Sequence, residues 1–496
     1  MKYRSTRDNS ACVSAAQAIA RGISPDGGLY LPVSLPALSG ARIQSLLEMD
    51  YRGRAQSILA DFLDDFTAQE LAYCVNAAYG KTFASEKITP LAKISPRTYM
   101  LELWHGPTCA FKDLALQLLP HLLTRSAQKT MDGNTVNILV ATSGDTGKAA
   151  LEGFCDVPGT NILVFYPANG VSRVQELQMT TQRGGNVSVC GVRGNFDDTQ
   201  TAVKGIFTDR GMRELCQQAG AVFSSANSIN WGRLAPQIIY YVSAYCELVQ
   251  SGEIKQGEQV NVAVPTGNFG NILAAYYAKG MGLPIGKLIC ASNVNNVLTD
   301  FLNTGVYDRR REFFVTSSPS MDILISSNLE RLLHSLTGSD DKAVAKLMSD
   351  LAGDGVYTVP AEVLKALRAD FYGGYCDEAA TAATLRDTFG EVGYLCDTHT
   401  AVALRVYQDY ARTSGDDTKT IIASTASPFK FAGSILSALT GKPSGDDEFA
   451  QLRELASLTK LTPPTQITEL ENSAPRFNAT CEREDMPRMV REMLGL

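Results

Sequence analysis

Five short runs of β-branched and aliphatic residues constrain the fold most, because each leads into a polar or glycine-rich turn and then an amphipathic stretch. The runs cover residues 136–142, 161–167, 186–192, 260–265 and 420–425. Repeated units of this kind predict parallel strands joined by crossover helices. We therefore expect an α/β protein with two doubly wound domains and mostly parallel sheets, with ligands at the carboxyl ends of the strands.

The rest of the chain divides around these units. Helical periodicity within residues 1–90 predicts a small, largely helical N-terminal region. Residues 91–440 are expected to form the two α/β domains, the smaller at roughly 100–225 and the larger at roughly 226–440. A polar linker and a helical tail are expected over 441–496.

Charge and cysteine content exclude several classes of function. The net charge of −7 gives no electrostatic footprint for nucleic acid or an anionic membrane. The 11 cysteines include no CxxC pair, and with only four histidines they indicate reduced thiols rather than disulfides or a zinc site. With no secretory signal pattern and no apolar run of membrane-spanning length, we expect a cytoplasmic protein without a metal.

Three polar loops follow strand-like runs at equivalent positions: TGNFGN at 266–271, SGDTG at 143–147 and STASP at 424–428. A glycine-rich turn before a helix exposes backbone N–H groups that can bind phosphate, although glycine there can also serve only a tight turn. Together the loops predict a phosphorylated ligand with several polar edges. None matches a dinucleotide or P-loop motif.

Lys112 is the candidate reactive residue. It lies in HGPTCAFKD, just before an apolar helical run, so it is predicted in the first turn of a helix. The positive end of the helix dipole disfavours the ammonium form, and a partly neutral amine is what imine formation with an aldehyde cofactor requires. A lysine at a helix start can also be an ordinary surface residue. Combined with a phosphate loop, it favours pyridoxal 5′-phosphate (PLP).

Two cysteine-containing segments are weaker candidates. The cluster from Cys396 to His399 contains potential metal ligands, but without further partners it predicts a packed, hydrogen-bonded turn. Cys109, near Lys112, is expected to be a buried thiol rather than a nucleophile.

These segments resemble the threonine synthases, PLP-dependent enzymes of the group that includes cysteine synthase and the tryptophan synthase β subunit. The resemblance covers most of the chain and is strongest to the long form of the family, which carries an extra N-terminal region. The segments that carry it are YRSTR, SPDGGLYLP, LELWHGPTCAFKD, ATSGDTGKAA, NSINWGRLAPQ, PTGNFGNILAAYYAKGMGLP, SPSMDILISSNLERLL, DTHTAVAL and STASPFKF.

The resemblance implies a fold type II PLP enzyme in which Lys112 binds the cofactor covalently and later moves protons. It implies that Thr425 hydrogen-bonds the pyridine nitrogen. The backbone amides that would hold the cofactor phosphate belong to Gly267, Asn268, Phe269, Gly270 and Asn271. The residues implied for the cofactor ring oxygen and the substrate carboxylate are Ser143, Asp145 and Thr146, and those implied for a substrate phosphate are Asn227, Ser228 and Arg233.

Two positions depart from related sequences. Asp145 stands where relatives of the cysteine synthase type have asparagine, so this anionic side chain needs a neighbouring donor or a proton. Ser427 stands where many threonine synthases have histidine, which leaves open any role of that histidine in proton transfer or phosphate departure.

The activity implied by the resemblance is conversion of O-phospho-L-homoserine and water to L-threonine and phosphate, by β,γ-elimination and hydration. Two alternatives stay open: a PLP-dependent lyase acting on O-phosphothreonine or related phospho-amino acids, and a non-catalytic metabolite-binding homologue. The expected partner is a small-molecule substrate, and the sequence does not decide between a monomer and a homodimer.

Overall fold

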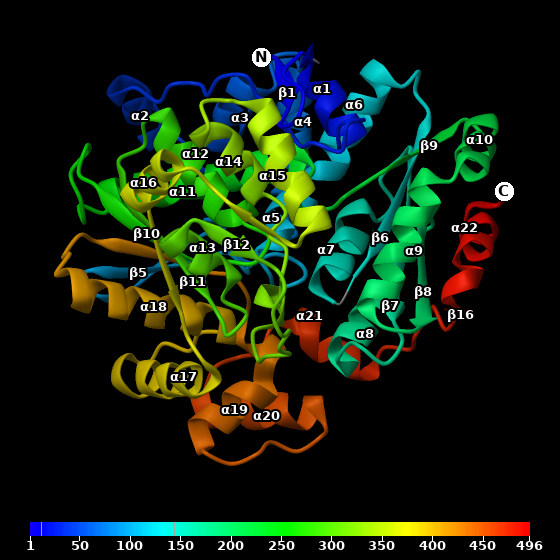
Figure 1. Ribbon diagram of the computed structural model, residues 1–496. Helices are drawn as coiled ribbons and strands as arrows, with labels where there is room; N and C mark the ends of the chain where they lie inside the picture. Colours follow the sequence, from blue (N-terminus) through cyan, green and yellow to red (C-terminus); the bar gives the residue numbers. More distant parts are fainter. Residues whose placement is uncertain (11, 143) are drawn as a thin grey trace.

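The computed structural model describes residues 1–10, 12–142 and 144–496. Two large sheets dominate the arrangement (Figure 1). The six-stranded sheet has the order β14 (Phe371–Tyr375), β11 (Ile285–Ser292), β10 (Val260–Pro265), β15 (Thr420–Ser424), β5 (Thr98–Glu102) and β4 (Leu91–Ser95). The five-stranded sheet has the order β16 (Thr480–Glu482), β8 (Val187–Arg193), β7 (Thr160–Pro167), β6 (Thr135–Ala141) and β9 (Ala221–Ser224).

Neighbouring strands in both sheets are parallel, apart from the antiparallel pair of β4 and β5. The predicted α/β class with mostly parallel sheets is therefore confirmed. The boundary expected near residue 100 is too early, because β5 pairs with β15 in the larger sheet and the smaller sheet begins at Thr135. A local hydrophobic pattern does not encode which distant strand a segment will join.

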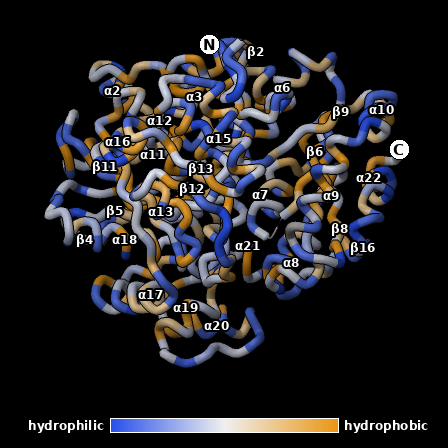
Figure 2. The backbone as a smooth tube through the Cα atoms, in the orientation of Figure 1, coloured by the Kyte–Doolittle hydropathy of each residue, from blue (hydrophilic) through white to orange (hydrophobic). Residues whose placement is uncertain are grey.

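Helices cover both faces of the larger sheet. The helices α11 (Trp231–Gln250) and α12 (Gly270–Met281) lie on one face, and α18 (Thr398–Ser414) lies on the other. Alternation along β10 explains this, because Val262 and Val264 pack into the α11–α12 core whereas Ala263 packs toward α18. Figure 2 shows hydrophobic residues concentrated along these strands and their covering helices.

The smaller sheet carries α7 (Asp145–Phe154), α8 (Arg173–Thr180), α9 (Phe196–Thr208) and α10 (Arg210–Gln218). Further α-helices between residues 91 and 420 are α5 (Lys112–Leu116), α6 (Leu119–Thr130), α13 (Val297–Thr304), α14 (Leu329–Leu336), α15 (Asp341–Gly353), α16 (Ala361–Asp370) and α17 (Glu378–Val392). A short pair, β12 (Val306–Asp308) and β13 (Val356–Thr358), forms an antiparallel ribbon.

The N-terminal ninety residues pack against α6 and α11. They contain α1 (Ala15–Arg21), α2 (Gly40–Leu47), α3 (Tyr51–Phe62) and α4 (Ala68–Ala78). They also contain an antiparallel sheet of β1 (Tyr3–Ser5), β2 (Cys12–Val13) and β3 (Tyr30–Pro32), which the helical pattern did not predict.

The C-terminal tail contains α19 (Ala432–Thr440), which starts inside the expected larger domain, and then α20 (Glu448–Thr459), α21 (Thr465–Thr468) and α22 (Met486–Leu494). The expectation of a purely helical tail is incomplete, because β16 pairs in parallel with β8 at the edge of the smaller sheet. No helix in the described part of the chain is long and apolar enough to cross a membrane.

Candidate active site

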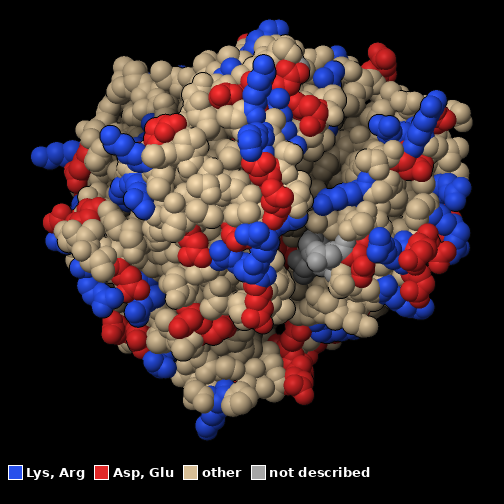
Figure 3. Space-filling model, in the orientation of Figure 1, with Lys and Arg blue, Asp and Glu red and all other residues tan. Residues whose placement is uncertain are grey.

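Two segments far apart in sequence meet where β5 and β15 end, and this meeting places Lys112. The backbone N–H of Phe111 donates to the carbonyl of Thr425 at 2.8 Å, and that of Ser427 donates to the carbonyl of Cys109 at 3.0 Å. Both segments leave the carboxyl ends of neighbouring parallel strands, which is where α/β sheets bind ligands. On the face drawn in Figure 3, a hollow lies between the part of the molecule that carries α15 and the part that carries α7.

Lys112 is the first residue of α5, as predicted, but its side chain is buried. Its Nζ lies 3.6 Å from Oδ2 of Asp145 and donates to Oγ of Ser320 at 3.2 Å. Burial lowers the pKa of Lys112, the charge of Asp145 opposes this, and the cations Lys430 and Arg233 lower the pKa further. The helix dipole invoked from the sequence is therefore not needed to account for a reactive amine.

Asp145 begins α7 and faces two lysines. Its Oδ1 lies 2.7 Å from Nζ of Lys430, and its Oδ2 faces Lys112. Burial works against the carboxylate, but Lys430 and Lys112 together hold the pKa of Asp145 well below its usual range. The cationic neighbour that this acidic side chain required is Lys430.

Sequence reasoning missed Lys430. It lies in a short 3₁₀ turn, Pro428–Phe431, and its Nζ also donates to the carbonyl of Thr108 at 3.0 Å. The available signal was a lysine inside the apolar stretch PFKF, directly after a predicted strand. A buried lysine nearly always has a charged partner.

Asp113 fixes the turn that precedes Lys112. Its Oδ2 accepts from the N–H of Thr108 at 2.8 Å, and its Oδ1 accepts from the hydroxyl of the same residue at 2.5 Å. Burial raises the pKa of Asp113 to about 6, although both bonds from Thr108 oppose the rise. A Cβ at Gly106 would lie 2.5 Å from Oδ2 of Asp113, so the turn needs glycine there.

The glycine-rich loop that begins at Thr266 joins β10 to α12. Phe269 is left-handed at φ 61°, and α12 begins at Gly270. A Cβ on Gly267 would lie 2.5 Å from the carbonyl oxygen of Ser320, so only glycine fits this contact. Asn328 donates to the carbonyl of Asn268 at 3.0 Å, which fixes the loop in front of the helix N-terminus.

Asn271 adds a free donor beside this loop. Its side-chain oxygen accepts hydroxyl protons from Tyr240, at 2.7 Å, and from Tyr241. Its side-chain nitrogen is buried and has no hydrogen-bond partner within the described residues. A helix N-terminus, a close glycine contact and an unpaired amide donor fit a phosphate group.

Thr425, directly after β15, is buried. Besides its bond to Phe111, its N–H donates to the hydroxyl of Thr400 at 3.3 Å. Ser427 is fully buried, and within the described residues its hydroxyl has no partner. Cys109 beside it is buried too, and burial raises the pKa of its thiol to about 12, which agrees with an unreactive thiol.

The segment from Cys396 to His399 forms the hydrogen-bonded turn that the sequence predicted. Asp397 caps α18, and its Oδ1 lies 2.8 Å from Nδ1 of His399. The turn also reaches the site, because Nε2 of His399 accepts from the N–H of Ser320 at 3.1 Å. Sequence reasoning did not single out Ser320, although SPSMD was one of the segments carrying the resemblance.

The three residues implied for a substrate phosphate differ in burial. Asn227 is exposed and Ser228 is half-buried, whereas Arg233, on the first turn of α11, is buried. Its Nη1 donates to the carbonyl of Ala226 at 2.9 Å, and its Nε has no partner among the described residues. Burial lowers the pKa of Arg233 to about 10. The charge of Arg233 also contributes to the lowered pKa of Lys112, so this amine has a second buried cation in its electrostatic surroundings.

Two further predicted residues come from the sequence segment 143–147. Thr146 is half-buried in the first turn of α7. Ser143 lies outside the described residues.

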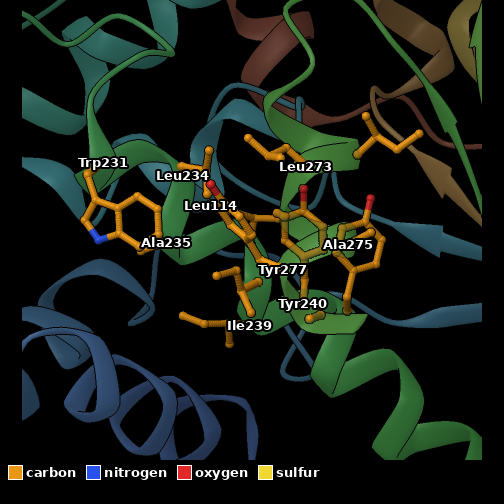
Figure 4. Packing of buried hydrophobic residues seen from close by; sticks show 14 of the residues in the cluster. Leu114, Trp231, Leu234, Ala235, Ile239, Tyr240, Leu273, Ala275 and Tyr277 are labelled. Carbon is orange, nitrogen blue, oxygen red and sulfur yellow. The ribbon is translucent and has the colours of Figure 1, made fainter. Parts of the chain in front are cut away.

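Apolar packing supports the site from behind. Figure 4 shows Trp231 and Tyr240 of α11 packed with Tyr277 of α12 and Leu114 of α5. All four side chains are buried, so the helix that carries Lys112 rests on a closely packed base.

Three family models match the chain. They are described as "Threonine synthase N terminus", over residues 2–79, "Pyridoxal-phosphate dependent enzyme", over residues 84–425, and "Threonine synthase, C-terminal", over residues 400–476.

Similar proteins carry related names. Threonine synthase-like 1 of Homo sapiens is 43% identical over 90% of this chain, which spans only 61% of that relative's length. Threonine synthase of Methylobacillus glycogenes is 39% identical, over 89% of this chain and 93% of the relative. The crystal structure of PLP-bound threonine synthase from Brucella melitensis is 36% identical, covers 99% of both chains and has a TM-score of 0.88. The predicted fold type II is thereby confirmed.

Proposed function

Because the chain belongs to the threonine synthase family of pyridoxal-phosphate-dependent enzymes, we propose that it converts O-phospho-L-homoserine and water to L-threonine and phosphate. Its cofactor is PLP. The observation that carries the proposal is the buried guanidinium of Arg233, which lies on α11 rather than in the glycine-rich loop and whose charge lowers the pKa of Lys112. A cofactor and a substrate that each bring a phosphate need two anion sites, whereas a dehydratase or a cysteine synthase needs only one.

The residues present fit PLP. We assign its covalent attachment to Nζ of Lys112 and its phosphate to the backbone amides of Gly267, Asn268, Phe269, Gly270 and Asn271. The hydroxyl of Thr425 would face the pyridine nitrogen. Bound PLP would act as an electron sink, accepting the electron pairs left on the substrate carbons when their protons are removed.

Charge decides how the substrate carboxylate is held. Asp145 is an anion paired with Lys430, so it would repel a carboxylate placed directly against it. We therefore assign the substrate carboxylate to the hydroxyls of Thr146 and Ser143 and the N-terminus of α7. Asp145 is better suited to a group that bears a proton, such as the cofactor ring hydroxyl or an amine.

Arg233 would hold the substrate phosphate, with Asn227 and Ser228 at the outer side. A buried guanidinium with an unpaired Nε–H gains strongly from a dianion that presents two oxygens. Lys112 would remove the substrate protons at Nζ, because burial keeps part of this amine neutral.

Release of phosphate from O-phospho-L-homoserine, with formation of L-threonine, tests the proposal. Purified full-length protein loaded with PLP should form both products in equal amounts, and a Lys112→Ala variant should form neither. A protein that binds PLP but leaves O-phospho-L-homoserine intact would contradict the proposed substrate.

A second candidate is a lyase acting on O-phosphothreonine or a related phospho-amino acid. We keep this candidate because the similar human protein is named only threonine synthase-like 1, a name that states no substrate. Phosphate release from O-phosphothreonine, and none from O-phospho-L-homoserine, would select it. A non-catalytic homologue is disfavoured by the buried lysine, and a protein with no visible absorption band from bound PLP would revive it.

A further inference from the structure

Two buried lysines share one carboxylate beside the glycine-rich loop. Nζ of Lys430 lies 2.7 Å from Oδ1 of Asp145, and Nζ of Lys112 lies 3.6 Å from Oδ2. The side chains of Lys430, Asp145 and Lys112 are 1%, 7% and 10% exposed. Water therefore screens these three charges poorly, and the charges of Lys430 and Asp145 both affect the protonation of Lys112.

The position of Lys430 is fixed by its surroundings. It follows the turn in which Ser427 bonds to Cys109, and its ammonium also donates to the carbonyl of Thr108. The neighbouring Phe429 is buried in an apolar cluster with helices α19 and α20. The carbonyl of Thr108 and the carboxylate of Asp145 both lie against this ammonium group, and the anchored backbone fixes its position.

A carboxylate with only Lys112 beside it would stabilise the ammonium form of that lysine. An ammonium has no lone pair and cannot attack an aldehyde. The closer cation on Lys430 balances the charge of the carboxylate, so the looser contact at 3.6 Å does not have to hold a proton on Lys112.

We propose that Lys430 is a positioning residue, which keeps Asp145 as a carboxylate and leaves the amine of Lys112 free to bind the aldehyde of PLP. It acts mainly through Asp145, although its charge also lowers the pKa of Lys112 directly. We assign it no contact with the substrate or the reacting carbon atoms. The inference rests on the proposed attachment of PLP to Lys112, and not on which phospho-amino acid is the substrate.

Other charged groups face the same cluster from neighbouring helices. Arg233 on α11 lowers the pKa of Lys112, and His399 on α18 favours the carboxylate form of Asp145. Both are identical in every variant proposed below, so they do not distinguish one variant from another.

The test is the apparent dissociation constant of PLP for the full-length protein, followed by visible absorption from neutral to alkaline pH. In Lys430→Met, binding near neutral pH should weaken by about tenfold for each unit by which the pKa of Lys112 rises. The pH at which binding becomes strong should move upward. Lys430→Arg should restore most of the binding, because it keeps the cation.

Lys442→Met, which removes an exposed lysine near the end of α19, is the matched control and should bind PLP like the wild type. An unchanged pH profile in Lys430→Met would overturn the proposal. Because no substrate is added, this outcome is independent of whether O-phospho-L-homoserine is turned over.

A double-mutant cycle with Asp145→Asn tests the route of the effect. If Lys430 acts mainly through Asp145, then Lys430→Met should have a clearly smaller effect on PLP binding in the Asp145→Asn background, where only its direct effect on Lys112 is lost. An equally large effect there would overturn the role of Asp145. Lys430→Met alone leaves the buried carboxylate of Asp145 without its closer cation, which could prevent folding. The double variant has no such carboxylate, so its PLP binding can still be compared with that of Asp145→Asn.

Discussion

The backbone N–H of Phe111 donates a hydrogen bond of 2.8 Å to the carbonyl oxygen of Thr425. This bond joins the residue before the reactive lysine to the residue proposed for the cofactor ring. One backbone contact therefore couples the position of the amine to that of the pyridine partner. A change that loosens either segment is expected to affect both.

Gly267→Ala should weaken PLP binding and destabilise the protein by about 2 kcal/mol, because the added Cβ would meet the carbonyl oxygen of Ser320 at 2.5 Å. Chemical denaturation and PLP titration measure the two effects. Gly205→Ala is the control: it lies inside α9 with nothing near its Cβ position, and should be neutral or stabilising. Equal stability of the two variants would contradict the close contact.

Asp113→Asn should remove one component of the pH dependence of stability. Burial raises the pKa of Asp113 to about 6 in the folded protein, whereas the ordinary pKa of a solvated aspartate side chain is 3.8. Between these values the native state binds more protons, so the free energy of unfolding contributed by this group falls as pH rises. Relative to Asp113→Asn, the free energy of unfolding of the wild type should fall by about 3 kcal/mol as the pH rises across this range.

Denaturation curves of both proteins at several pH values test this difference. The lost contact to Thr108 changes the free energy of unfolding of the variant by an amount that does not depend on pH. The test therefore compares the slopes of the free energy of unfolding against pH. Parallel stability profiles would show that Asp113 does not titrate in this range.

Arg233→Met should lower kcat/KM for O-phospho-L-homoserine by about 100-fold, since a buried charge-assisted contact to phosphate is lost. PLP binding should weaken less than substrate turnover, because the cofactor phosphate is assigned to the glycine-rich loop and only the effect of Arg233 on the pKa of Lys112 is lost. Arg210→Met, at an exposed arginine paired with Glu214, serves as the control. A larger loss of PLP binding than of substrate turnover would contradict this assignment and indicate that Arg233 binds the cofactor.

Ser427→Ala should leave stability within about 1 kcal/mol of the wild type, because the buried hydroxyl has no protein partner among the described residues. If this hydroxyl assists phosphate departure, kcat falls while the dissociation constant of PLP stays constant. Steady-state kinetics and PLP titration together separate these effects. Unchanged kcat would exclude the hydroxyl from the reaction.

Local pattern and loop chemistry predicted much of this molecule. The runs before 143–147, 266–271 and 424–428 are parallel strands, and Lys112 opens a helix. These features depend on residues close together in sequence. The resemblance added the proposed roles of individual residues, which spacing alone did not supply.

Features that depend on distant partners were missed. The proposed role of Lys430 depends on the fold, which brings its Nζ to 2.7 Å from Oδ1 of Asp145. The assignment of β5 to the larger sheet depends on β15, near the other end of the α/β region. The pKa of Lys112 depends mainly on burial, which the N-terminal position of a helix does not reveal.

The pairing of β16 with β8 has a consequence for biosynthesis. β8 is an outer strand of the smaller sheet until the segment Thr480–Glu482 lies beside it. A ribosome synthesises β6 to β9 more than 250 residues before that segment, so the edge of β8 cannot be covered by β16 until Thr480–Glu482 has been made. Exposed strand edges can pair with other chains. The strand that covers this edge is thus made after all the other strands of its sheet.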